Sequence, residues 1–129
     1  AAYEFVCTHP NLPEDLIPYW DFDAVNIPHE LRDASVAAIM AAALYELSMY
    51  SNKAEYKETA DKVMHSLSSS DYRSKIGENH NFLLMHSVGS YPHGSEIDVP
   101  LIYADYYFLE ALKRKRDCDI EAKSKSVQK

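Results

Sequence analysis

The sequence has 129 residues, 47% hydrophobic and 12% aromatic, a composition that excludes a disordered chain. Thirteen basic and twenty acidic residues give a formal net charge of −7. This charge argues against nucleic acid or an anionic membrane as a partner, because both are bound by basic surfaces. Only three glycines are present, too few for a turn-rich β-sandwich, and we expect both cysteines to be free thiols.

Residues 1–7 have the pattern of a helix end, stopped by Pro10. Because the pattern is already under way at residue 1, we expect further chain upstream. Residues 8–32 contain four prolines and are predicted to form a long loop. A helix capped by Asp33 or Ser35 follows and runs to about Tyr50. It has no polar face after its first turn, which predicts burial on all sides.

The next helix is predicted over residues 53–68 and is amphipathic. One stripe is apolar, with members at helical spacing: Tyr56, Ala60, Val63, Met64 and Leu67. Residues 69–98 form a second long loop, in which 82–85 are expected to pair as a strand. A last helix is predicted with Asp98 as its cap and Pro100 in its first turn, apolar nearly all round from Val99 to Leu112. Residues 117–129 are charged and are predicted to be a disordered tail.

The order of elements is therefore buried helix, surface helix, buried helix, with a long loop before each buried one. An α/α toroid has this arrangement, and an ordinary small α-bundle is the alternative. Two helices that are apolar all round are hard to cover within one short chain. We therefore expect missing chain, a partner, or both, and take residues 1–116 as one structural segment.

Trp20 is the only tryptophan and lies among carboxylates in the first loop. It fits a stacking platform for a sugar ring, or an aromatic anchor that holds the loop to the core. Asp21 and Asp23 suit an acid/base pair for glycoside hydrolysis. Residues two apart in an extended loop point to opposite sides, so loop bracing is the favoured role for each. Arg32 is expected to brace Asp21 or Asp23, or to bind a ligand carboxylate, while Asp33 caps the helix.

The segment 86–95 concentrates hydroxyls, imidazoles and glycines ahead of the last helix. Such a loop offers neutral donors for sugar hydroxyls or a sulfate, and a plain connector is the alternative. The histidines have no metal-ligand spacing, so no metal site is predicted.

Five segments in the same order carry a resemblance to a known family: 12–15, 19–22, 32–35, 86–87 and 94–112. Together they resemble the C-terminal third of the unsaturated glucuronyl hydrolases, glycoside hydrolase family 88. The resemblance extends over about residues 9–116. It implies an all-α fold, namely the C-terminal part of a six-hairpin α/α toroid with alternating inner and outer helices.

The resemblance also implies a reaction. Members of the family hydrate the C4–C5 double bond of a terminal unsaturated uronate in disaccharides left by polysaccharide lyases. The adjacent sugar is released, and neither a metal nor an organic cofactor is used. Two aspartates carry this chemistry in motifs that nothing in 1–129 matches. We therefore expect no catalytic residue here, a catalytic pair upstream of residue 1, and no activity from this chain alone.

The positions that carry over are structural ones and a rim beside the leaving sugar. The structural group comprises Asp21, Arg32, Asp33 and Asp98. The predicted substrate-binding group comprises Trp20, His86, Ser87, Ser90, Tyr91 and His93. The expected partners are an unsaturated uronate disaccharide and, through exposed apolar helix faces, a second copy of the chain. The resemblance suggests a bacterial cytoplasmic or periplasmic protein, and the alternative function is a non-catalytic helical module that binds carbohydrate or protein.

Overall fold

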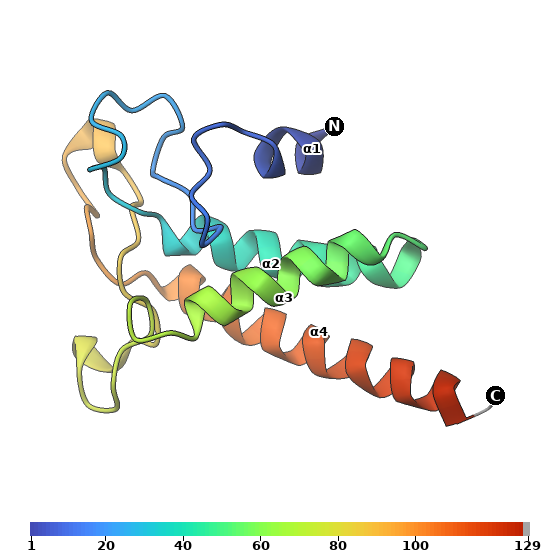
Figure 1. The fold of residues 1–129 in the computed structure, drawn as a ribbon. Coiled ribbons are helices and arrows are strands. Elements are labelled where there is room, and N and C mark those ends of the chain that lie inside the picture. Colours follow the sequence, from blue (N-terminus) through green and yellow to red (C-terminus); the bar gives the residue numbers. More distant parts are fainter. Residues whose placement is uncertain (128–129) are drawn as a thin grey trace.

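The computed structural model describes residues 1–127, which form helices joined by long loops (Figure 1). The α-helices are α1 (Ala2–Cys7), α2 (Ala34–Tyr50), α3 (Ala54–Leu67) and α4 (Ile102–Val127). Two short 3₁₀ turns, η1 (Asn79–Asn81) and η2 (Tyr91–His93), interrupt the second long loop. The described residues contain isolated β-bridges and no strand, so the predicted all-α class is confirmed. None of their helices is both long and apolar enough to cross a membrane.

Helix α2 lies at the centre and packs against both α3 and α4. Its buried surface is rich in alanine, with Ala37, Ala38 and Ala41 fully buried, and also includes Leu44 and Tyr45. Small side chains allow neighbouring helices to approach closely. The Asp33 side chain caps the helix by accepting a hydrogen bond from the Ser35 N–H, as predicted. Burial on all sides is not observed, because Val36, Ile39 and Leu47 are each exposed by about two-fifths or more.

Helix α3 is amphipathic, as predicted. It turns back along α2, and Ala60, Val63, Met64 and Leu67 are buried against the core. The opposite side is not wholly solvated, since Asp61 joins the three long helices. Its carboxylate accepts hydrogen bonds from Tyr45 of α2 at 2.6 Å, Lys57 of α3 at 2.9 Å and Lys115 of α4 at 2.7 Å.

Helix α4 begins later and ends later than predicted. The backbone of Val99 is held extended, because it exchanges two hydrogen bonds with Ser87, at 3.1 and 3.0 Å. Helical geometry is also disfavoured at Val99 because it precedes a proline. The helix starts only at Ile102, after Pro100. Asp98 is therefore not its cap. At the other end, residues 117–127 are helical and Cys118 is buried, which corrects the prediction of a disordered tail. Residues 128–129 lie outside the described residues.

The two long loops gather at one end of the helices, beside the beginnings of α2 and α4 and the end of α3 (Figure 1). The expected strand at 82–85 is reduced to a single bridge between Arg73 and Leu84. Both cysteines are free thiols, as predicted. On α4, Ile102, Tyr106 and Leu109 leave more than half of their surface exposed, so an apolar stripe remains uncovered in this chain.

Candidate functional site: the rim formed by the two long loops

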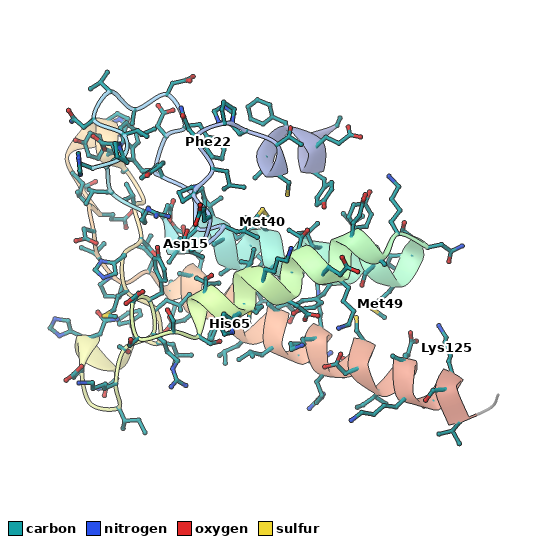
Figure 2. All side chains as sticks on the ribbon, in the orientation of Figure 1. Asp15, Phe22, Met40, Met49, His65 and Lys125 are labelled. Carbon is teal, nitrogen blue, oxygen red and sulfur yellow. The ribbon has the colours of Figure 1, made fainter. Side chains whose placement is uncertain are left out.

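Asp15 ties the first long loop to the second. Its carboxylate accepts hydrogen bonds from Arg32 and Tyr72, both at 2.8 Å, and from the Ile17 N–H at 3.1 Å. Partial burial would raise the pKa of Asp15, but these hydrogen bonds and the Arg32 charge outweigh it and lower that pKa. Asp15 lies at the loop end of α2, and Lys125 lies at the far end of the molecule (Figure 2).

A pocket of about 250 Å³ opens between the two loops beside this tie. Its lining residues come from both loops: Glu30, Leu31, Arg32, Asp71, Tyr72, His86 and Asp98. Three of them are carboxylates, and the one guanidinium is already paired with Asp15. The charge of this pocket therefore does not favour the carboxylate or sulfate of an acidic sugar.

Trp20 and Tyr91 stack on each other. Their ring centroids are 4.1 Å apart and their planes differ by 14°. The indole N–H of Trp20 donates to Glu30 at 2.6 Å, and with Asn26 this bond lowers the pKa of Glu30. One indole face is thus covered by protein, which supports the anchoring role of Trp20. Tyr91 remains 38% exposed and carries aromatic surface to the rim.

The predicted residues of the segment 86–95 fall into two places. Ser90 and His93 lie together at the surface beside Tyr91, with Oγ and Nδ1 2.9 Å apart. His86 lies in the pocket between the loops, where its Nδ1 is 2.7 Å from a carboxylate oxygen of Asp98. This contact holds the start of the segment 86–95 against the residues that follow it. The structural role of Asp98 is therefore its bond to His86, and it does not cap the helix.

Ser87 does not reach the surface. The residue is fully buried, and its hydroxyl has no hydrogen-bond partner among the described residues. The predicted contact between Ser87 and a ligand is therefore at odds with this structure. Next to it, Asp33 accepts from the Ser35 hydroxyl at 2.6 Å and from the Val88 N–H at 3.4 Å. The cap of α2 thereby also holds the second loop.

The predicted brace between Arg32 and Asp21 or Asp23 is wrong, because Arg32 pairs with Asp15 instead. Asp21 accepts a hydrogen bond from the Asp23 N–H at 2.9 Å, a local turn at the surface. An Asx turn of this kind braces the loop locally.

Sequence reasoning missed Asp15, which joins the two loops, and Tyr72 and Glu30, which line the pocket. The first of them lies in the segment 12–15, where its position after a proline in a shared motif was an available signal. Tyr72 is separated from Asp15 by 57 residues, and no spacing rule relates two loops so far apart.

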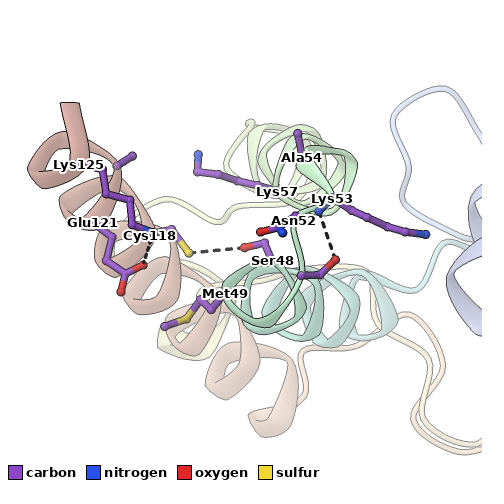
Figure 3. Close-up of a pocket in the computed structure, with 11 residues that line it drawn as sticks. Ser48, Met49, Asn52, Lys53, Ala54, Lys57, Cys118, Glu121 and Lys125 are labelled. Carbon is purple, nitrogen blue, oxygen red and sulfur yellow. Dashed lines mark hydrogen bonds and ion pairs between the residues drawn. The ribbon is translucent and has the colours of Figure 1, made fainter. Parts of the chain in front are cut away.

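A second hollow, of about 280 Å³, lies at the opposite end between the α2–α3 turn and the last turns of α4 (Figure 3). Its lysines already have acidic partners: Lys57 pairs with Asp61 and Asp119, and Lys125 with Glu121. Its cations are thus neutralised within the chain. Nowhere in residues 1–127 do three or more His, Cys, Asp or Glu side chains gather in a way that could hold a metal ion.

We compared the sequence and the structure with those of known proteins. No protein-family model matches the chain. It is 48% identical to an unsaturated glucuronyl hydrolase of Formosa agariphila over 117 residues, which are 91% of this chain and 29% of that protein. The crystal structure of an unsaturated glucuronyl hydrolase specific for heparin superposes with a TM-score of 0.88 at 47% identity, covering 91% of this chain and 32% of the other.

A variant of the Streptococcus agalactiae enzyme, crystallised with dGlcA-GalNAc6S, superposes with a TM-score of 0.72 at 31% identity. It covers 82% of this chain and 29% of the other. The fold is thus that of a segment of an α/α-toroid hydrolase. The chain is homologous to the unsaturated glucuronyl hydrolases, which confirms the resemblance found in its sequence, and it spans about 30% of the length of the relatives it matches.

Proposed function

We propose that this chain is the C-terminal segment of an enzyme that hydrates the C4–C5 double bond of terminal unsaturated uronates. The substrates are disaccharides generated by polysaccharide lyases, and the reaction releases the adjacent sugar. The observation that carries the proposal is the 48% identity over 117 residues to an unsaturated glucuronyl hydrolase. Relatives are solved with saccharides such as dGlcA-GalNAc6S, which supports a disaccharide as the ligand.

Within that enzyme, we assign the chain a part in substrate positioning and not in proton transfer. Four carboxylates at the loop end already accept hydrogen bonds from this chain: Asp15 from Arg32, Asp21 from Asp23, Asp33 from Ser35 and Asp98 from His86. A general acid or base must instead reach the reacting carbon. The proposed positioning residues are Trp20 and Tyr91 as the aromatic wall, Ser90 and His93 as polar contacts, and His86 in the pocket between the loops.

A turnover assay tests the assignment. Loss of the ultraviolet absorbance of the unsaturated uronate follows the reaction directly. We expect turnover from an enzyme that contains this segment and its upstream helices, and none from residues 1–129 alone. Activity of the isolated chain that is abolished by Asp21→Asn or Asp33→Asn would place the catalysis here and contradict the proposal.

The rim is tested by Ser90→Ala and His93→Ala in the complete enzyme. Each lost neutral hydrogen bond should weaken binding roughly 2- to 12-fold. The loss should depend on the sugar beside the uronate and on its sulfation, because these side chains face the leaving sugar in the proposal. An equal drop in turnover for every disaccharide, with binding unchanged, would make the segment a connector.

We also propose that the isolated chain self-associates. Ile102, Tyr106 and Leu109 of α4 and Val36, Ile39 and Leu47 of α2 expose apolar surface that water disfavours. Size-exclusion chromatography should show a species larger than a monomer. A monomer that melts cooperatively would instead favour a stand-alone binding module.

A further inference from the structure

The loop between α3 and the segment 86–95 lines an open cavity at the surface that the proposed function does not use. Its volume is about 590 Å³, more than twice that of the pocket beside Asp15. Charged and polar side chains line it (Arg73, Lys75, Ser70, Ser74 and Asn81), together with the apolar ring of Phe82. We propose that this cavity is a second binding site, for the sulfate or carboxylate group of an anionic saccharide.

The cavity differs in its charge from the two pockets described above. Arg73 and Lys75 line it without an acidic side chain among the lining residues, and neither forms an ion pair with any described residue. The cations around the two pockets described above, Arg32 and Lys57 among them, are paired with acidic side chains. In a chain with a net charge of −7, this loop therefore offers cations that remain available to an external anion.

The loop is also held in shape. Asp105 of α4 accepts hydrogen bonds from the N–H groups of Leu83 and Leu84, at 2.8 and 2.9 Å. The Asn79 amide donates to the Leu84 carbonyl at 2.9 Å, and the Ser74 hydroxyl donates to the Phe82 carbonyl. Asn79, His80 and Asn81 in succession have left-handed backbone angles, which asparagine tolerates but which are unfavourable for His80. The cavity wall is thus formed before any ligand binds, which lowers the entropy cost of binding.

The lining chemistry selects an oxyanion that is attached to a sugar. A guanidinium presents paired donors that match two oxygens of a sulfate or carboxylate, and Lys75 adds a point charge. Phe82, and Ile76 with its fully exposed side chain, give apolar surface against which the C–H face of a pyranose packs. Choosing a saccharide as the carrier of the anion rests on the proposed function, whereas the preference for an oxyanion rests on the loop alone.

An NMR titration of the chain tests the site. Sodium sulfate is added at constant ionic strength, with sodium chloride as the reference salt. We expect saturable shifts confined to the amides of residues 70–77 and 81–83. Arg73→Ala or Lys75→Ala should weaken the apparent affinity on the order of 10-fold, as expected for loss of a charged hydrogen bond. Lys62→Ala removes an equal charge from the exposed side of α3 and should change nothing.

Shifts that do not saturate, that are the same in chloride, or that weaken equally in Lys62→Ala would overturn the inference. The same titration with an unsaturated uronate disaccharide, sulfated and unsulfated, identifies the carrier. Disaccharide shifts at 70–83 that exceed those of sulfate support a saccharide site. If sulfate binds but the disaccharides cause no shift at 70–83, the assignment of a saccharide as the ligand is wrong, and the site binds only a free oxyanion. Failure of the turnover assay with sulfate binding retained would count against the proposed function alone.

Discussion

The phenol hydroxyl of Tyr72 donates a 2.8 Å hydrogen bond to Oδ2 of Asp15, joining two loops that are 57 residues apart in the sequence. Arg32 and the Ile17 N–H bind the other oxygen of the same carboxylate. The rim that carries Trp20 and the segment 86–95 therefore depends on one buried tyrosine and one half-buried aspartate. Changes at either residue are expected to act on both loops together.

Replacing Tyr72 with phenylalanine removes only this hydroxyl. Tyr72 is 7% exposed, so Asp15 loses a donor that water replaces poorly, and the free energy of unfolding should fall by about 0.5–1.5 kcal/mol. Urea denaturation measures the change. Tyr50→Phe is the control, because Tyr50 is 82% exposed and should show no effect. An unchanged stability in Tyr72→Phe would mean that the loops are held elsewhere.

The sequence predicted the helices better than it predicted the contacts of the loops. The alanine-rich stretch before Tyr50 and the stripe of Val63 and Leu67 repeat with the helical period, so α2 and α3 were found within a few residues. Arg32 was assigned the wrong partner, because the choice among Asp15, Asp21 and Asp23 depends on how a proline-rich loop folds back. Local periodicity carries no information about such a long-range contact.

The start of the last helix was also mispredicted because of a long-range contact. Asp98 has the residue type of a cap and Pro100 suits a first turn, which made the predicted start reasonable. The backbone pairing of Ser87 with Val99 decides otherwise, since it holds the chain extended up to the proline. The charged residues 117–127 were predicted to be disordered, but ion pairs such as Lys113–Asp117 and Lys115–Asp119 support a helix there.

The free energy of unfolding should depend on pH in the acid range because of Asp61. Partial burial alone would raise the pKa of Asp61, but hydrogen bonds from Lys115, Tyr45 and Lys57 lower it to about 2 from 3.8. Because the pKa is lower in the folded chain, this carboxylate stabilises the fold above 3.8, and the contribution disappears as the pH falls towards 2. With one-third of the side chain exposed, about 1–2 kcal/mol remains after screening by solvent.

Asp61→Asn should remove this part of the acid dependence, as measured by urea denaturation across that pH range. Glu58→Gln, on the exposed side of the same helix, is the matched control. Asp15 also has a lowered pKa, so a smaller slope should remain in Asp61→Asn. A slope as steep as that of the unmodified chain would rule out Asp61 as its main source.

The stack of Trp20 on Tyr91 gives the loops a spectroscopic reporter, because Trp20 is the only tryptophan. Tyr91→Ala uncovers one face of the indole, so its fluorescence emission should move to longer wavelength. Loss of the aromatic pair should also cost about 0.5–1.5 kcal/mol of stability. Tyr91→Phe keeps the ring and should leave the emission unchanged. Identical spectra for both variants would mean that the two rings do not stack in solution.

Two buried serines lie beside the start of α2, and replacing each with alanine is expected to have a different effect on stability. The Ser35 hydroxyl donates to the buried Asp33 at 2.6 Å, and Ser35→Ala should lower the free energy of unfolding by about 1–3 kcal/mol, because the carboxylate loses a donor. The Ser87 hydroxyl has no partner among the described residues, so Ser87→Ala should be neutral or stabilising by up to about 1 kcal/mol. Thermal and urea unfolding of the two variants measure the difference. A destabilisation by Ser87→Ala equal to that of Ser35→Ala would show that Ser87 is bonded in solution and would refute its burial without a partner.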